Sequence, residues 1–200
     1  MKLKDYLNKH HKTHLIFDFD DTLFNLLLPW KDRNKCLMFA KNKLIQLDAR
    51  LYQKYQDSDL SLTEVQNEYV RKFGKKAKKI TYNNCVKFES YFCKGVTTND
   101  ELIDFVKKNQ EFKLFIWSSN TRPTIAKFLK EYQILDKFKK IVTSLEVVLI
   151  KPYIDGFKLI YNPEVPKKNY LMIGNSNADR QAAKNSGIDF FFVDVLNQEK

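Results

Sequence analysis

Short, continuous apolar runs recur along the chain and alternate with segments of helical periodicity. The runs cover residues 15–19, 114–117, 141–143, 170–173 and 190–193. They lack the alternation of apolar and polar residues that marks a half-buried strand, so we expect strands buried on both faces. The helical pattern covers residues 98–109, 123–132, 155–161 and 177–186. This order of strands and helices predicts an α/β fold with a Rossmann-like, doubly wound parallel sheet.

Residues 26–97 break this rhythm and show no convincing strand pattern. Apolar residues recur at helical spacing between residues 35 and 55. Ser61 and Glu64 match a capping box, and a further short helix is expected around Phe88. The sequence therefore predicts an all-helical insertion at 26–97 in a core formed by residues 1–25 and 98–200.

The composition is that of a globular protein. Hydrophobic residues make up 44% of the 200 residues, and aromatic residues make up 14%, which allows a sizeable core. No apolar run approaches the ~20 residues needed to cross a bilayer, and the basic start of the chain lacks the apolar stretch of a signal peptide. The three cysteines include no CxxC pair, which favours reduced thiols. We expect a cytoplasmic protein without membrane contact.

The chain is basic, with 35 Lys and Arg against 24 Asp and Glu and a net charge of +11. Such a charge is compatible with nucleic acid or with anionic substrates. The densest basic run, residues 72–79, is short and offers one aromatic side chain for stacking, so we interpret it as a solvated face. Three histidines, His10, His11 and His14, lack carboxylates or cysteines at ligand spacing and suggest a frayed terminus, not a metal site.

The first apolar run stops on crowded carboxylates, in the stretch LIFDFDDTLF at residues 15–24. Asp18, Asp20 and Asp21 stand almost side by side. Like charges this close repel one another, and burying them is costly. A bound cation would offset both costs, so the sequence predicts a cationic partner at this point.

Polar side chains also follow the later strands. Ser118, Ser119 and Asn120 follow the second strand, Lys151 comes beyond the third, and the stretch GNSNAD at 174–179 follows the fourth. Ligands of doubly wound sheets bind at the carboxyl ends of the strands, so these groups should meet at one rim. Together they suit Mg²⁺, which prefers oxygen ligands, and a phosphoryl group, which needs cations and N–H donors.

These segments resemble the four motifs of the haloacid dehalogenase superfamily of phosphatases. A strand followed by DxDx(T/V) matches LIFDFDDTL, a strand ending in Ser or Thr matches LFIWS, a Lys followed by Pro matches IKP, and a GDxxxD-like turn matches LMIGNSNAD. Each motif alone is weak evidence, but all four occur in order and frame nearly the whole chain. The helical insertion lies where the family's type 1 caps lie.

The resemblance implies a role for each matching residue. Asp18 would be the nucleophile that forms an aspartyl-phosphate, and Asp20 would be the general acid and base. Ser118, with Ser119 and Asn120, would bind phosphoryl oxygens, and Lys151 would neutralise charge between phosphate and nucleophile. The implied Mg²⁺ site consists of Asp18, the backbone carbonyl of Asp20, Asn175 and Asp179. Asp21 and Thr22 are interpreted as residues that shape the turn.

The second acid bears on the reaction class. An aspartate two residues after the nucleophile marks phosphatases and phosphomutases in this superfamily, so Asp20 argues against C–halogen chemistry. The resemblance therefore implies a Mg²⁺-dependent phosphomonoester hydrolase that acts on a small phosphorylated metabolite. Sugar phosphates, nucleotides and phosphoglycolate-like acids stay open as substrates.

One position departs from the family pattern. Asn175 stands where the fourth motif usually has an aspartate, and an amide oxygen carries no charge toward the metal. Two alternatives therefore stay open. The first is a phosphotransferase or mutase of the same superfamily, and the second is a weakened pseudo-enzyme whose basic surface binds nucleic acid or a protein partner.

Overall fold

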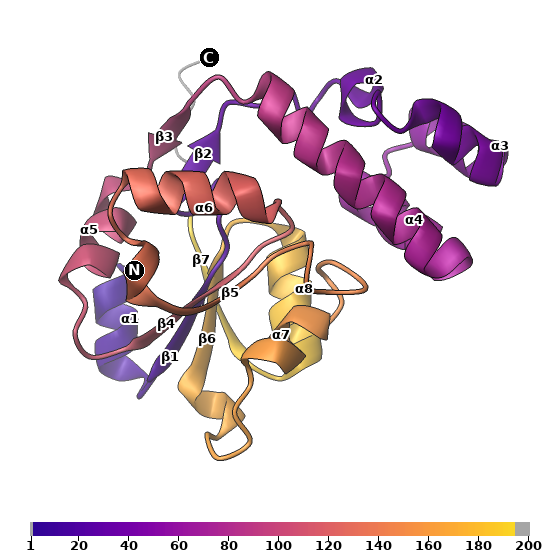
Figure 1. The fold of residues 1–200 in the computed structure, drawn as a ribbon. Coiled ribbons are helices and arrows are strands. Elements are labelled where there is room, and N and C mark those ends of the chain that lie inside the picture. The colour runs from indigo at the N-terminus through magenta and orange to yellow at the C-terminus, as the bar shows by residue number, and fades with distance from the viewer. Residues whose placement is uncertain (1, 195–200) are drawn as a thin grey trace.

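The computed structural model describes residues 2–194 and shows a five-stranded parallel sheet with helices on both faces (Figure 1). The strand order is β5-β4-β1-β6-β7, with all neighbouring pairs parallel. The strands are β1 (His14–Phe17), β4 (Lys113–Trp117), β5 (Phe138–Val142), β6 (Tyr170–Gly174) and β7 (Asp189–Phe192). The predicted α/β class and the Rossmann-like, doubly wound core are confirmed.

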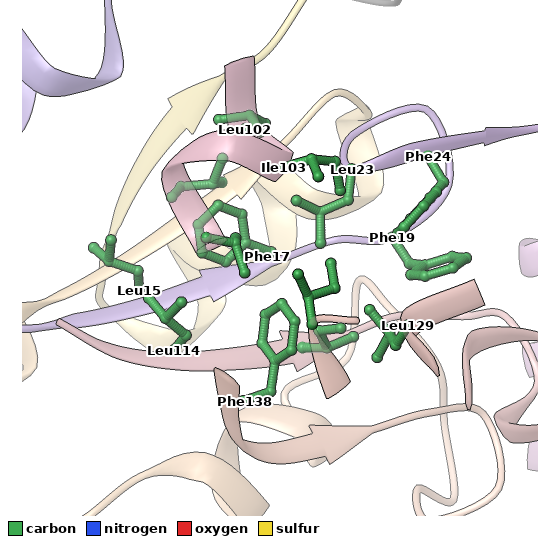
Figure 2. Packing of buried hydrophobic residues seen from close by; sticks show 14 of the residues in the cluster. Leu15, Phe17, Phe19, Leu23, Phe24, Leu102, Ile103, Leu114, Leu129 and Phe138 are labelled. Atoms are coloured by element: carbon green, nitrogen blue, oxygen red, sulfur yellow. The ribbon is translucent and has the colours of Figure 1, made fainter. Parts of the chain in front are cut away.

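Two hydrophobic clusters sandwich the sheet because neighbouring strand residues point to opposite faces. Leu15 and Phe17 pack on one side against α1 (Leu3–Lys9), α5 (Asp100–Lys108) and α6 (Arg122–Glu131), as Figure 2 shows in part. Ile16 packs on the other side, against the cluster that contains residues of α7 (Asp155–Ile160) and α8 (Asn177–Ser186). Short 3₁₀ turns, η1 (Leu135–Lys137) and η2 (Lys167–Asn169), precede β5 and β6.

A two-stranded antiparallel ribbon joins the sheet to the helical insertion. It pairs β2 (Phe24–Leu26) with β3 (Val96–Thr98), so that the chain leaves and re-enters the core side by side (Figure 1). Sequence analysis missed this ribbon because three residues a strand give too short a pattern to recognise. Both predicted domain boundaries, 25/26 and 97/98, fall within it, and the division into two domains stays a prediction.

The helical region, residues 33–92, has a hydrophobic core of its own. It consists of α2 (Arg33–Cys36), α3 (Lys41–Asp57) and α4 (Leu62–Phe92), which pack around residues such as Leu44 and Tyr69. The helical spacing noted between residues 35 and 55 is divided between two helices, because the chain turns between α2 and α3. Helix α3 is also kinked at Asp48, whose side chain accepts the Leu51 amide at 2.9 Å.

The helix α4 is longer than the sequence suggests. The predicted capping box is present, since Ser61 accepts from the Glu64 amide and the Glu64 carboxylate accepts from the Ser61 amide. The separate helix expected around Phe88 is the second half of α4, which continues past a kink at Gly74. Gly74 has φ of 56°, a conformation that a glycine adopts without steric cost.

The start of the chain is a helix and not a frayed terminus. Leu3 and Leu7 of α1 are buried in the core cluster, and His14 is a buried residue of β1. Leu3 and Leu7 are four residues apart and therefore lie on the same face of the helix. The lysines around them in the sequence hide this short apolar pattern. The described residues contain no group of three or more histidines, cysteines or acids arranged to hold a metal.

The remaining sequence expectations concern cysteines and surface charge. Cys36, Cys85 and Cys93 are free thiols, as expected. Four lysines of the basic run are exposed, namely Lys72, Lys75, Lys76 and Lys79, in keeping with a solvated face. Within residues 2–194, no helix is both long and apolar enough to cross a membrane.

Candidate active site

A cavity of about 940 Å³ lies at the carboxyl ends of β1, β4 and β6, between the sheet and the helical region. Six of the predicted site residues line it: Asp18, Asp20, Ser119, Asn120, Lys151 and Asn175. The two others, Ser118 and Asp179, are buried next to it, with exposed fractions of 3% and 0%. The far wall comes from α4, including Glu64 and Glu89. The fold thus gathers residues from four separate motifs around one space.

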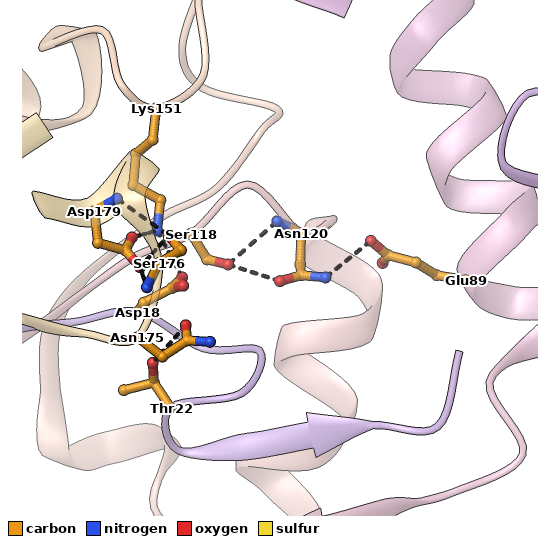
Figure 3. A network of polar contacts seen from close by, with 9 residues as sticks. All are labelled: Asp18, Thr22, Glu89, Ser118, Asn120, Lys151, Asn175, Ser176 and Asp179. Carbon is orange, nitrogen blue, oxygen red and sulfur yellow. Dashed lines mark hydrogen bonds and ion pairs between the residues drawn. The ribbon is translucent and has the colours of Figure 1, made fainter. Parts of the chain in front are cut away.

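Asp18 and Lys151 form a buried ion pair at this cavity. Lys151 Nζ lies 2.7 Å from Asp18 Oδ1, and it also pairs closely with Asp179 Oδ1 (Figure 3). Burial, followed by the charge of Asp179, raises the pKa of Asp18 to about 7, while Lys151 opposes this. Burial by itself would lower the pKa of Lys151, but the two carboxylates together raise it, so the lysine is a cation at neutral pH.

Asp179 is held by the first turn of α8. Its Oδ2 accepts from the Ser176 hydroxyl at 2.6 Å and from the Ser176 amide at 3.0 Å, while Ser176 Oγ accepts from the Asp179 amide, which completes a capping box. Both carboxylate oxygens therefore have partners inside the protein. Asp179 orients Lys151, and its predicted contact with Mg²⁺ stays a prediction.

Close packing around Asp179 requires a glycine at the end of β6. A Cβ atom added to Gly174 would lie 2.7 Å from Cγ and Oδ2 of Asp179, far inside van der Waals contact. Gly174 therefore lacks a side chain so that the Asp179 carboxylate can lie close to the backbone. The sequence alone does not reveal this reason for the glycine.

Asp20 is fixed by the segment that leads into the helical region. Its Oδ1 accepts from the Leu26 amide at 2.8 Å, and its Oδ2 accepts from the Trp30 indole N–H at 2.9 Å. Burial raises the pKa of Asp20 well above its ordinary value, although the Leu26 hydrogen bond opposes this. A carboxyl group with a raised pKa retains a proton that it can donate.

The turn after β4 is organised by a chain of hydrogen bonds (Figure 3). Ser118 Oγ donates to Asn120 Oδ1 at 2.8 Å, and the Asn120 amide donates back to Ser118 Oγ at 3.2 Å. Asn120 Nδ2 donates to Glu89 of α4 at 3.3 Å. The Ser118 hydroxyl is thus directed into the turn, and its predicted contact with phosphate stays a prediction.

Sequence reasoning missed three residues of the site: Trp30, Glu89 and Ser176. Glu89 gave a usable signal, because it follows the buried Phe88 directly and lies four residues after the buried Cys85, on the inward face of α4. A carboxylate on the inward face of a helix needs hydrogen-bond donors beside it. Such a residue therefore predicts a polar contact between the helix and another part of the protein. The capping role of Ser176 could have been read from its spacing to Asp179.

The oxygen atoms at the cavity fit a hard divalent cation. Asp18 Oδ1 is buried and pairs with the Lys151 ammonium at 2.7 Å, and a carboxylate oxygen has a second lone pair to offer a metal ion. Asn175 Oδ1 accepts from Thr22 Oγ1 at 3.4 Å, which is a long contact that leaves the amide oxygen free for a stronger partner. The carboxylate of Asp18, the carbonyl of Asp20 and the amide oxygen of Asn175 would hold Mg²⁺, with water as further ligands.

Comparison with protein families matches residues 15–193 to the haloacid dehalogenase-like hydrolases. The chain belongs to this family. The match spans all four motifs and the helical region between the first and the second. Comparison with curated proteins finds no match.

Several solved structures share the fold. The putative HAD-hydrolase YfnB from Bacillus subtilis, described as bound to magnesium, is 19% identical, with a TM-score of 0.53 over 91% of this chain and 86% of its own. A putative phosphoglycolate phosphatase from Lactobacillus plantarum is 16% identical, with a TM-score of 0.53 over 90% and 84%. A putative β-phosphoglucomutase from Thermotoga maritima is 19% identical, with a TM-score of 0.53 over 94% and 88%. At these identities the likeness concerns the fold.

Proposed function

We propose that this haloacid dehalogenase-like hydrolase is a Mg²⁺-dependent phosphatase that cleaves small phosphomonoesters. The observation that carries the proposal is the pairing of Asp18 with Lys151 at the cavity, with a second acid, Asp20, two residues on. The magnesium described for YfnB and the phosphatase among the similar structures support the same chemistry. We further propose that residues 26–97 act as a type 1 cap over the cavity.

Asp18 is the nucleophile in this proposal. Its carboxylate oxygen attacks phosphorus, a new P–O bond forms, and the ester P–O bond breaks to give an aspartyl-phosphate. Lys151 neutralises charge between the phosphoryl oxygens and Asp18. Mg²⁺ held by Asp18, the Asp20 carbonyl and Asn175 would supply positive charge beside Asp18 and would favour its ionised form.

Asp20 is the proton carrier. Its raised pKa allows it to protonate the leaving oxygen of the substrate alcohol in the first step. In the second step the ionised Asp20 takes a proton from water, the water oxygen bonds to phosphorus, and the bond to Asp18 breaks to release phosphate. The hydrogen bonds from the Leu26 amide and the Trp30 indole use one lone pair on each oxygen of Asp20 and leave the second lone pair for the proton.

Turnover of an activated aryl phosphate tests this proposal directly. Release of the aryl alcohol should require Mg²⁺ and should stop when a chelator removes the metal. Activity that survives exhaustive chelation contradicts the metal assignment. A screen of phosphorylated metabolites with Mg²⁺ then identifies the substrate.

Phosphoryl transfer to a sugar is the second candidate, supported by the putative β-phosphoglucomutase among the similar structures. Such a phosphotransferase would form the same aspartyl-phosphate in its first step. In its second step a sugar hydroxyl, and not water, would accept the phosphoryl group. Slow hydrolysis combined with efficient transfer to a sugar acceptor would favour it. A salt-sensitive gel shift without phosphatase activity would instead favour a nucleic-acid-binding role for the basic surface.

A further inference from the structure

Glu89 is a buried carboxylate through which α4 contacts the turn after β4. It is 1% exposed and lies on the last turn of α4. Its oxygens accept hydrogen bonds from Asn120 Nδ2 at 3.3 Å and from the Thr121 amide at 3.2 Å, and the Thr121 hydroxyl also donates to it. These donors belong to the turn after β4, to which the family resemblance assigns the binding of phosphoryl oxygens.

The contact with Glu89 determines how the Asn120 side chain is oriented. An ionised carboxylate can only accept hydrogen bonds, so Asn120 turns its NH₂ group toward Glu89 and its carbonyl oxygen toward Ser118. The Ser118 hydroxyl donates to that carbonyl, as Figure 3 shows. One side chain of the helical region thereby fixes the polar groups of the turn.

A negative charge at this place needs a reason. A carboxylate that lines a phosphate-binding cavity repels the anion, and burying it costs free energy unless donors satisfy it. Burial raises the pKa of Glu89, whereas hydrogen bonds from Thr121, Thr124 and Asn120 lower it. The hydrogen-bond donors of the turn therefore stabilise the charge of Glu89, and the substrate does not.

We propose that Glu89 is a positioning residue for phosphate binding. It holds Asn120 and Thr121, and with them the turn whose Ser119 and Asn120 line the cavity, in the conformation that receives the phosphoryl group. This inference rests on the proposed function and adds that the helical region takes part in phosphate affinity through a defined hydrogen-bonded contact.

The test is Glu89→Gln, measured by calorimetric titration with inorganic phosphate in saturating Mg²⁺. Glutamine keeps the shape, but its NH₂ group faces groups that also donate, so at least one of the hydrogen bonds is lost. Phosphate should bind about tenfold more weakly, the order expected for a lost charge-assisted hydrogen bond. If Glu89 only repelled phosphate, the change in affinity would have the opposite direction, because removing the negative charge would make phosphate bind more tightly. Unchanged or tighter binding overturns the proposal.

Two further variants keep the test free of folding effects. Glu68→Gln removes an exposed carboxylate of the same helix that pairs with Arg71, and phosphate affinity should not change. Thr121→Val keeps the shape of Thr121 and removes its hydroxyl donor, so it should weaken binding by a smaller factor than Glu89→Gln. It replaces Glu89→Gln if that variant does not fold.

Failure of this inference differs from failure of the proposed function. Wild-type protein that neither turns over an aryl phosphate nor binds phosphate overturns both. Wild-type protein that does both, together with Glu89→Gln and Thr121→Val variants that bind phosphate equally well, overturns the role of Glu89 alone. A melting temperature lowered by Glu89→Gln with phosphate affinity unchanged would assign the residue to stability and likewise overturn the proposal.

Discussion

Nζ of Lys151 and Oδ1 of Asp18 lie 2.7 Å apart, while Asp179 holds the same ammonium group from another direction. The lysine thus pairs with two carboxylates, and Asp18 is the one of them that lines the cavity. When both carboxylates are ionised, the trio carries a net negative charge, which favours a cation beside Asp18. The proposed chemistry depends on this arrangement, and so do the predictions that follow.

Asp18→Asn should lower the turnover of an aryl phosphate by several orders of magnitude without unfolding the protein. The amide is a poor nucleophile, and covalent nucleophiles are among the residues whose loss costs most. Steady-state kinetics and circular dichroism measure the two effects. Asp21→Asn is the matched control, because it makes the same change three residues on, at a turn position with φ of 56° that asparagine tolerates. Near-wild-type activity of Asp18→Asn would rule out the covalent mechanism.

Metal-free protein should lose stability as the pH rises from about 4 to about 7. The folded chain raises the pKa of Asp18 to about 7, whereas an exposed aspartate titrates near 3.9. Between these values the folded state binds the proton more tightly than the unfolded state does, so a rising pH favours unfolding. Asp20 and Glu89, whose pKa values burial also raises, act in the same direction.

Denaturant unfolding in a chelating buffer at several pH values measures this dependence. Asp18→Asn removes one titrating group and should make the dependence shallower. Carboxyl groups with lowered pKa values, such as Glu64, act in the opposite direction but are common to both proteins. An identical pH dependence of wild type and variant would show that Asp18 does not carry the raised pKa.

The core could be predicted from the sequence because strands buried on both faces give continuous apolar runs. The run at 170–173 became β6, and the helices predicted at 123–132 and 177–186 became α6 and α8 to within a residue. Gly187 ends α8 with φ of 70°, the left-handed conformation in which helices commonly stop at a glycine. These elements depend on local patterns, which a single sequence carries in full.

Features that depend on contacts between distant segments could not be predicted in this way. The β2–β3 ribbon exists because residues 24 and 98 pair across the insertion, and neither three-residue strand has a pattern by itself. The role of Glu89 depends on Asn120, which lies 31 positions away in the sequence. The motifs identified which residues approach one another, but the hydrogen bonds that orient them required the fold.

Gly174→Ala should lower both stability and activity. The added Cβ would lie 2.7 Å from the Asp179 carboxylate, so Asp179 has to shift and Lys151 loses its support. Overpacking of this kind costs about 1–3 kcal/mol. Gly95→Ala is the matched control, because its Cβ would meet Leu27 at an ordinary 3.7 Å. Chemical unfolding and kcat measure the effect, and equal behaviour of the two variants would contradict the close approach.

The enzyme should prefer glycerol 3-phosphate to 3-phosphoglycerate. The two compounds have similar size, but the second carries a carboxylate in its leaving group. On the wall that α4 contributes, the charged side chains among the described lining residues are Glu64 and Glu89, both acidic. They disfavour an anionic leaving group through repulsion. Comparison of kcat/KM for the pair measures the preference, and a higher value for 3-phosphoglycerate would refute it.

Asn175→Asp should lower the Mg²⁺ concentration that gives half-maximal activity. Mg²⁺ gains affinity from carboxylates, and an uncharged amide oxygen is the weaker ligand. Both oxygens of Asp179 already pair with Lys151 and Ser176, so its predicted contact with Mg²⁺ would be shared with these partners. The native protein should therefore need a high Mg²⁺ concentration, and Asp179→Asn should weaken phosphate binding through Lys151.

Titration of activity against Mg²⁺ compares the variants, and calorimetric Mg²⁺ binding gives a readout without turnover. Asn177→Asp is the matched control, since it adds the same charge at an exposed position on the cavity wall two residues on. It should lower the Mg²⁺ requirement much less than Asn175→Asp. The opposite result for Asn175→Asp has a physical reason as well, because a further carboxylate beside Asp18 and Asp20 raises their pKa values and holds them protonated. A Mg²⁺ requirement that rises in Asn175→Asp would therefore show that the pocket is adapted to the amide.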